Sequence, residues 1–379
     1  MISKVLANYD FEENVDTIEK LDGGNVNLTY ALTLTGGKKY VLQKINGNVF
    51  PRSKEVMANF LAIKRVFSDK SEAERSLFYP GAASAEKTLD KIAVPDIKLT
   101  RYGEPFAFTD GDVWRVFSFV KSNKNLHTRL NRESITEATG RAFGSFVRVM
   151  DGSRIPMYDV IADFHCPRKR IKALFDSADA APADRFEDCK DLLEKFSVAG
   201  DFIEKWSEET ERNFKRIVHN DAKTDNILFS DNGGFFDENE THCESKMTFT
   251  IIDLDTTMYG FLPYDFGDGA RSACSMTKED EKNLSEVCFS VPLFKAYAKG
   301  YIGALSGVVS DRERECCAVS PRLIALELSA RFLKDYLDGN KYFAVRYEEQ
   351  NLVRARCQFA LAEDISAKQK ELKNIVLSV

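Results

Sequence analysis

Residues 219–226, HNDAKTDN, place several polar side chains on a short stretch between two apolar runs. The stretch matches the pattern H-x-D-x-x-x-x-N at every specified position, and this spacing is typical of phosphoryl-transfer loops. An aspartate that points into a cleft can accept the proton of an attacking hydroxyl group. An amide oxygen five residues later can reach a magnesium ion on the transferred phosphate. We therefore expect Asp221 to be a base and Asn226 a metal ligand.

Two neighbours of Asp221 have predicted roles of their own. Lys223 lies two residues after the aspartate, where many protein kinases carry a lysine that steadies the γ-phosphate. His219 is expected to be a packed, hydrogen-bonded anchor rather than a base. Because four fixed positions recur by chance, the assignment requires support from other parts of the chain.

A second acidic site follows the run FTIIDLD, residues 249–255, which ends a predicted buried strand with two aspartates. A carboxylate at such a strand end needs a partner, and a magnesium ion that bridges phosphate oxygens provides one. We predict that Asp253 is this metal ligand. Asp255 is the competing candidate, and it could instead be a cap or a hydrogen-bond acceptor beside the metal site.

The nucleotide side of the cleft is predicted from the N-terminal third. The segment 22–27, DGGNVN, is a glycine-bearing turn before a strand, which could bring backbone amides and Asn27 near phosphates. Lys44 shares a strand face with Leu42, as the lysine and alanine of V-A-I-K do, and it is the predicted phosphate cation. Its alternative is a solvated lysine on an edge strand, and Glu55 is a weaker candidate for its partner. A P-loop is excluded because the sequence contains no G-x(4)-G-K-[ST].

Two periodicities position these residues. Apolar alternation with glycine-bearing turns predicts strands over the first 120 residues, and a spacing of three to four predicts helices elsewhere. The predicted strands are 27–34, 39–45, 97–99, 106–108 and 113–120, and the predicted helices are 51–67, 131–150 with Asn131 as its cap, 192–216 and most of the chain after Lys278. The predicted fold is α+β, with a β-rich lobe over residues 1–122 and a mainly helical lobe over residues 123–379.

Composition sets the broad class of the protein. The 379 residues are 44% hydrophobic and 30% charged, which excludes a disordered chain. The net charge of −6 disfavours a duplex-DNA binder, which needs a basic face, and no stretch approaches the roughly 20 apolar residues that span a bilayer. The eight cysteines lack the spacing of zinc sites and are too dilute for a disulfide scaffold. We expect a cytoplasmic protein with no nucleic-acid or membrane partner.

Taken in order, these segments resemble the aminoglycoside phosphotransferase-like kinases, which act on small molecules with a two-lobed, protein-kinase-like fold. The resemblance is closer to the sugar kinases among them, N-acetylhexosamine 1-kinase and its relatives. It is carried by GNVNLTY (24–30), YVLQKIN (40–46), WRVF (114–117), HNDAKTDN (219–226), IIDLDTTMYGFLPYDFGDGARS (251–272) and RFLKDYLDG (331–339). Relatives often carry glycine where this chain has Asn220, or arginine where it has Lys44.

The resemblance implies transfer of the γ-phosphate of ATP to the anomeric hydroxyl of N-acetylglucosamine or N-acetylgalactosamine. It implies ATP and Mg²⁺ as cofactors, with Asp221 as the base, Asn226 and Asp253 as Mg²⁺ ligands and Lys44 as the phosphate lysine. Adenine would lie against the hinge near Phe119 and Val120, with the hinge itself close to Asn123.

Three residues of the helical lobe also have expected roles. In this fold, an aspartate at the place of Asp265 supports the catalytic loop from beneath as a buried acceptor. Arg271 and Arg331 would contact the sugar. The competing role of Arg331 is a salt bridge with Glu327, four residues earlier on the same helix face.

Two alternatives remain open. The acceptor could be choline or ethanolamine, homoserine, methylthioribose or an aminoglycoside, although the arginines late in the chain favour a neutral polyol over a cationic antibiotic. The protein could also be a pseudokinase that binds nucleotide without turnover, although such proteins usually lose a catalytic aspartate or metal ligand. The sequence does not determine the oligomeric state.

Overall fold

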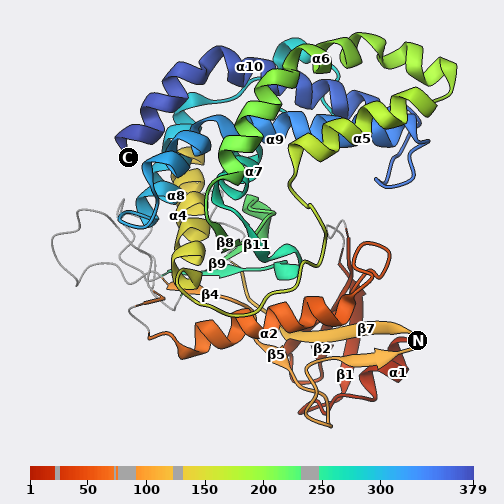
Figure 1. The fold of residues 1–379 in the computed structure, drawn as a ribbon. Helices are drawn as coiled ribbons and strands as arrows, with labels where there is room; N and C mark the ends of the chain where they lie inside the picture. The colour runs from red at the N-terminus through yellow and green to blue at the C-terminus, as the bar shows by residue number, and fades with distance from the viewer. Residues whose placement is uncertain (22–25, 72–73, 76–90, 123–130, 232–246) are drawn as a thin grey trace.

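The N-terminal part of the chain forms an antiparallel sheet at one end of the molecule (Figure 1). The computed structural model describes the whole chain except residues 22–25, 72–73, 76–90, 123–130 and 232–246. The strand order is β1-β2-β3-β7-β5, with β6 paired to β7. The strands are β1 (Val15–Lys20), β2 (Leu28–Leu34), β3 (Lys39–Lys44), β5 (Ile97–Lys98), β6 (Ala107–Thr109) and β7 (Asp112–Ser118). All five predicted strands form, with ends shifted by at most two residues.

The side chains of this sheet alternate between two packed faces. On one face, Leu42 and Trp114 pack with Val5 of the short helix α1 (Ile2–Leu6). On the other face lies α2 (Ser53–Asp69), where the rings of Phe60 and Phe117 have centroids 5.2 Å apart. Which face a side chain occupies therefore decides whether it can reach the rest of the molecule.

The remainder of the chain is mainly helical (Figure 1). The helices are α4 (Arg132–Met150), α5 (Pro167–Ala180), α6 (Ala183–Glu211), α7 (Leu262–Cys274), α8 (Val291–Ala304), α9 (Asp311–Leu337) and α10 (Gln350–Ser378). Asn131 caps α4 as predicted, since its side chain accepts the N–H of Ser134 at 2.8 Å. Gly144 lets α4 approach α8 closely, because a side chain there would collide with the backbone of Tyr301.

The predicted helix over 192–216 is wrong at both ends. The helix α6 begins at Ala183 and ends at Glu211, and the next residues form the strand β8 (Lys215–Val218). The sequence of α5 and the start of α6 is rich in charged residues, so only a few apolar positions such as Leu174 are buried. Because the apolar pattern is this weak, an argument based on periodicity misses α5 and the start of α6.

Two small sheets lie between the helices and carry the loops of interest. The strand β8 pairs with β11 (Met258–Phe261), and β10 (Met247–Ile251) lies between β9 (Ile227–Asp231) and β4 (Lys91–Ala93). The short strand β4 lies within residues 1–122 but pairs in parallel with β10. The N-terminal and C-terminal parts therefore share backbone hydrogen bonds.

The predicted α+β class, with an N-terminal sheet and a helical C-terminal part, is confirmed. The boundary at residues 122 and 123 stays a prediction, because the expected hinge at Asn123 lies outside the described residues. Within the described ranges, no helix combines the length and the apolar character that crossing a bilayer requires.

Candidate active site

The loop from β8 to β9 is anchored by His219, whose ring is fully buried. The ring packs edge-on against Phe143, with centroids 5.2 Å apart. Its Nε2 donates to the carbonyl oxygen of Ile252 at 2.9 Å, and its Nδ1 accepts the N–H of Asp221 at 3.2 Å. The prediction that His219 is an anchor is confirmed.

The next residue, Asn220, is held by a buried acceptor beneath the loop. Its φ of +65° lies in the left-handed region, which asparagine tolerates better than most residues. Asp265 of α7 accepts the N–H of Asn220 through Oδ1 and the hydroxyl of Tyr301 through Oδ2, both at 2.6 Å. Burial raises the pKa of Asp265, and these two hydrogen bonds oppose the rise. The predicted supporting role of Asp265 is confirmed.

Asp221 lies at the centre of the polar side chains of the loop. Lys223 Nζ is 2.7 Å from Asp221 Oδ2, and Asn226 Nδ2 donates to the same oxygen at 2.9 Å. Burial alone would raise the pKa of Asp221, but the charge and hydrogen bond of Lys223, with help from Asn226, bring that pKa below its ordinary value. Asp221 is therefore ionised at neutral pH and can accept a proton.

Asp253 lies two residues after β10, the central strand of the small sheet, and caps the turn η2 (Leu254–Thr256) with a φ of +58°. Its side chain reaches solvent, but the protein around it, followed by the nearby negative charges of Asp255 and Asp221, raises the pKa of Asp253 to about 6. A carboxylate in such surroundings is stabilised by a divalent cation.

The donor atoms near Asp253 suit a magnesium ion. The amide nitrogen of Asn226 is bonded to Asp221, so its amide oxygen is the atom left to face a metal. One carboxylate and one amide oxygen, with phosphate and water oxygens completing the shell, are ligands that Mg²⁺ accepts. The residues present therefore fit the metal that the resemblance implies.

Asp255 has a different environment, with a side chain that is only 2% exposed. Arg115 of β7 donates from Nη2 to Asp255 Oδ2 at 2.8 Å, and its Nη1 lies 2.7 Å from Asp255 Oδ1 as an ion pair. Asn27 donates to Oδ2 at 2.6 Å, and its own Oδ1 accepts the N–H of Asn46 at 3.0 Å. Asp255 is thus a buried hydrogen-bond acceptor beside the predicted metal ligand Asp253, and Asn27, which we predicted to bind nucleotide, donates to it.

Lys44 is not brought into this group of residues. It lies on the same face of β3 as Leu42, as predicted, but Leu42 packs on the side covered by α1. Lys44 Nζ is 2.5 Å from Asp112 Oδ2, and both side chains are about one quarter exposed. Glu55, the suggested partner of Lys44, pairs with Arg52 at 2.8 Å instead.

Arg115 is the buried cation on the face that Lys44 does not reach, and our sequence argument assigned it no role. It lies in the strand DVWRVFS between large apolar residues. A guanidinium in such a strand must have a carboxylate partner, and this was the available signal. The partner itself is 140 positions away in the sequence.

Phe119 and Val120 follow directly after β7. Phe119 is 40% exposed, and Lys39 Nζ lies 5.9 Å from the centre of its ring. Their contact with adenine stays a prediction, and so does the role of the glycine turn, since Gly23 and Gly24 lie outside the described residues.

Arg271 of α7 is mostly buried and lies on the catalytic side of the helix. Its Nη2 donates to Asp268 Oδ1 at 2.9 Å, and its Nη1 donates to Gln358 Oε1 of α10 at 3.3 Å. The carboxylate of Asp221 is close enough to act on the pKa of Arg271, which the neighbouring acids raise against the effect of burial.

Arg331 of α9 has an aromatic environment. Its guanidinium lies 5.7 Å from the ring centre of Phe164 and 5.6 Å from that of Phe343. The alternative salt bridge with Glu327 does not form, because Glu327 faces His165 at 3.2 Å. Across the part of the chain that the structure describes, no carboxylate lies within ion-pair distance of Arg331.

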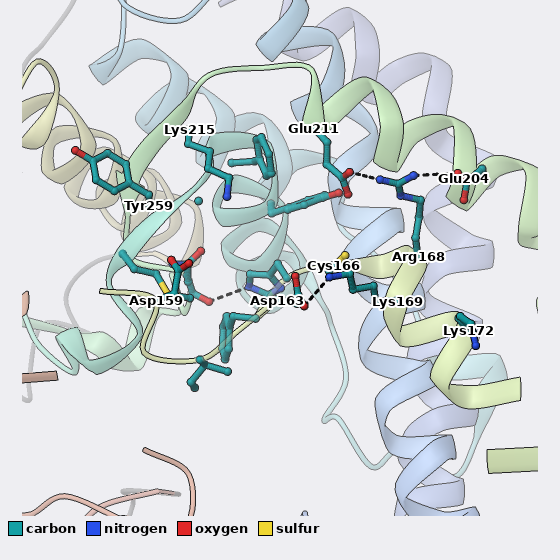
Figure 2. A pocket seen from close by; sticks show the side chains of 18 residues that line it. Asp159, Asp163, Cys166, Arg168, Lys169, Lys172, Glu204, Glu211, Lys215 and Tyr259 are labelled. Atoms are coloured by element: carbon teal, nitrogen blue, oxygen red, sulfur yellow. Dashed lines mark hydrogen bonds and ion pairs between the residues drawn. The ribbon is translucent and has the colours of Figure 1, made fainter. Parts of the chain in front are cut away.

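His165 connects this region to the catalytic loop, and our sequence argument did not identify it. Its Nε2 donates to the carbonyl oxygen of Asn220 at 2.9 Å. Burial would lower the pKa of His165, but the adjacent Glu327 raises it. The ring also lines a cavity of about 770 Å³ between β11, α5 and α6, where Arg168 pairs with Glu211 (Figure 2).

Comparison with known proteins agrees with this architecture. An aminopropanol kinase associated with microcompartments has a TM-score of 0.63 at 15% identity, with 98% of each chain covered. An aminoglycoside phosphotransferase from Alicyclobacillus acidocaldarius has a TM-score of 0.62 at 12% identity, covering 100% of this chain and 96% of that one. A choline kinase from Cryptosporidium parvum has a TM-score of 0.53 at 11% identity, covering 100% and 98%. At such identities the likeness shows a shared fold.

Family membership follows from the sequence profile that the chain matches. The profile of the phosphotransferase enzyme family covers residues 17–282, which include the N-terminal sheet, the catalytic loop and both aspartates after β10. Since this match covers most of the chain, the protein belongs to the phosphotransferase enzyme family.

Proposed function

We propose that this protein is an ATP- and Mg²⁺-dependent small-molecule kinase whose acceptor is the anomeric hydroxyl of an N-acetylhexosamine. The observation that carries the kinase part is the ionised carboxylate of Asp221, bonded to Lys223 and Asn226. Membership of a phosphotransferase family supports the same chemistry. The sugar part rests on the resemblance and on the two arginines of the acceptor side.

In the proposed reaction, the acceptor hydroxyl lies within hydrogen-bond reach of Asp221. Its oxygen attacks the γ-phosphorus, the bond from that phosphorus to the β–γ bridging oxygen breaks, and ADP leaves. The proton of the hydroxyl passes to the Asp221 carboxylate. Lys223 stabilises the charge of the transferring phosphate, and Mg²⁺ held by Asn226 and Asp253 would neutralise charge on the phosphates when bound.

The acceptor side favours a neutral molecule with many oxygen atoms. Arg331 has no carboxylate partner within the described ranges, so its donors are available to hydroxyl or carbonyl oxygens. The rings of Phe164 and Phe343 beside it can pack against the C–H groups of a sugar. A quaternary ammonium group or an aminoglycoside would instead meet like charge at Arg271 and Arg331.

An amino alcohol is the second candidate acceptor. Two of the proteins with a similar fold are an aminopropanol kinase and a choline kinase. In this chain, Asp268 is within reach of the same region, although Arg271 already pairs with it. An amine acceptor would therefore have to compete with Arg271 for this carboxylate.

A panel of acceptors tests the proposal. Purified protein is incubated with ATP, Mg²⁺ and N-acetylglucosamine, N-acetylgalactosamine, choline, ethanolamine, aminopropanol, homoserine, methylthioribose or an aminoglycoside. ADP release gives the rate, and phosphorus NMR of the product gives the phosphorylated position. Turnover with an N-acetylhexosamine at its anomeric oxygen supports the proposal. Turnover with another acceptor only would reject the sugar assignment, and nucleotide binding without any turnover would favour a pseudokinase.

A matched pair of variants tests the acceptor contact. Arg331→Ala should raise the KM of the sugar about tenfold or more and leave the KM of ATP within about twofold, because a hydrogen bond from a charged donor is lost. The control is Lys334→Ala on the same helix, whose lysine pairs with Asp338. If the KM of the sugar is the same in Arg331→Ala and in the control, Arg331 does not contact the acceptor.

A further inference from the structure

We propose that Arg115, acting through Asp255, positions the metal-binding segment of the active site from the N-terminal sheet. Arg115 would be a positioning residue rather than a phosphate ligand, and its effect would appear in the Mg²⁺-dependent binding of nucleotide. The inference rests on the proposed function, because it assumes that Asp253 binds the metal of a metal–nucleotide complex.

The first step is that the guanidinium of Arg115 is held rigidly and completely used. Its side chain is 2% exposed, and its Nη2 donates to Asp255 Oδ2 at 2.8 Å. Its Nη1 lies 2.7 Å from Asp255 Oδ1 as an ion pair and donates to Met57 Sδ at 3.7 Å. Its Nε donates to Gln43 Oε1 at 3.0 Å, and Gln43 is its direct partner across β3 and β7. The ring of Phe117 lies 4.9 Å from the guanidinium carbon. Each nitrogen of the guanidinium is therefore engaged by a neighbouring side chain rather than directed at a phosphate.

The second step is that side chains of the N-terminal part hold the turn η2 in two places. The central residue of η2, Asp255, is bonded to Arg115 of β7 and to Asn27, which lies directly before β2. At the C-terminal end of η2, Asn59 of α2 donates to the carbonyl oxygen of Thr257 at 3.2 Å. The position of η2 therefore depends on side chains that lie far from it in the sequence.

The third step links η2 to the metal ligand. Asp253 is the cap of η2, and only Leu254 separates it from Asp255. Its left-handed backbone conformation is uncommon for a residue other than glycine and persists only where the surrounding structure enforces it. A shift of Asp255 would let this conformation relax and would move the carboxylate of Asp253 away from Asn226. Residues that orient metal ligands in this way typically change metal affinity by about 10- to 100-fold.

The test measures binding of the non-hydrolysable analogue AMP-PNP by calorimetry, with Mg²⁺ and in EDTA, to the full-length protein. For Arg115→Met we expect the affinity with Mg²⁺ to fall about tenfold or more, and the affinity in EDTA to change less than about twofold. The Mg²⁺ concentration for half-maximal activity should rise similarly, whereas the KM of the acceptor should not. Arg115→Lys keeps the charge but loses the fork, so it should give an intermediate loss.

Two controls keep the result interpretable. Lys98→Met removes a cation from β5, which also pairs with β7, without touching Asp255; Lys98 lies near Glu12, and the change should leave both affinities unchanged. If Arg115→Met folds poorly because Asp255 is left buried and unpaired, the double variant with Asp255→Asn removes that charge. The double variant should fold and still show the Mg²⁺-dependent loss.

The outcomes separate the two proposals. Folded Arg115 variants with normal Mg²⁺-dependent binding would overturn the inference, and so would an equal loss with Mg²⁺ and in EDTA, which indicates general damage. Unmodified protein that binds no nucleotide would instead reject the proposed function.

Discussion

The two sides of the active site present their polar groups in different ways. On the C-terminal side, the proposed base and one proposed metal ligand lie within the eight residues 219–226, and Asp265 supports this loop from below. On the N-terminal side, the buried cation Arg115 lies in the middle of a strand, and its contacts come from β3, α2 and η2. When functional side chains lie on one loop, the spacing of the sequence predicts which of them meet. When they lie on a sheet, their contacts depend on which face of the sheet packs against the neighbouring elements.

The largest expected effect concerns the loop. Asp221→Asn removes the proton acceptor and keeps the size of the side chain, so kcat should fall at least about 100-fold. Nucleotide affinity should change less than about threefold, because the metal ligands remain. The matched control is Asp225→Asn, an exposed neighbour in the same loop. Steady-state rates and AMP-PNP calorimetry measure both quantities, and near-normal turnover would show that the base lies elsewhere.

The next effect concerns the support of the loop. Asp265→Ala leaves the N–H of Asn220 and the hydroxyl of Tyr301 buried without their acceptor. The free energy of unfolding should fall by about 2–4 kcal/mol, since each unsatisfied group costs about 1–3 kcal/mol. Urea unfolding measures this value. Asp265→Asn keeps one acceptor and should lose about half as much, and an equal loss in both variants would contradict this account.

A smaller effect is expected on thermal stability, in which Asp253 and Asp255 should differ. The pKa of Asp253 is raised from 3.8 to about 6, so the folded protein binds this proton more tightly than the unfolded chain does. Stability therefore falls as pH rises from about 4 to 6, and the loss persists above pH 6. In EDTA at pH 7.5, Asp253→Asn should raise the Tm by about 1–3 °C, and the gain should vanish below pH 4.

The same variant separates stability from function. Asp253→Asn should lose the stabilisation that Mg²⁺ and ATP give to the unmodified protein, although it is more stable without them. Asp255→Asn should instead lower the Tm, because Arg115 would lose its charged partner in a buried site. If Asp255→Asn instead had the higher Tm in EDTA and lost the stabilisation by Mg²⁺ and ATP, Asp255 would be the metal ligand and Asp253 the structural residue.

The smallest expected effect is on the N-terminal side. Lys44→Met breaks a partly exposed ion pair with Asp112, and exposed pairs contribute at most about 1 kcal/mol. The kcat/KM for ATP should change less than about threefold. A tenfold or larger loss of kcat/KM for ATP would show that Lys44 binds the phosphates. Both sides of the active site would then have been predicted correctly from the sequence.

Particular residues show how far sequence reasoning reached. His219 has the packed role that we predicted for the first position of the loop, and Asp265 has the supporting role that the family resemblance implied. The alternation that put Lys44 and Leu42 on one face was right, but alternation alone does not tell which face is turned toward α2. Asp253 and Asp255 follow the same strand, so only the partners supplied by other elements distinguish them.

The sequence by itself determined the five predicted strands of the N-terminal sheet and the spacing of the polar residues in the loop 219–226. These properties are local, since periodicity and spacing act over a few residues. Only the tertiary structure decided that Arg115 pairs with Asp255, and that His165 bonds to the carbonyl of Asn220, across 140 and 55 positions. Such pairs form because separate elements pack against one another, and no local pattern records which buried charge will meet which partner.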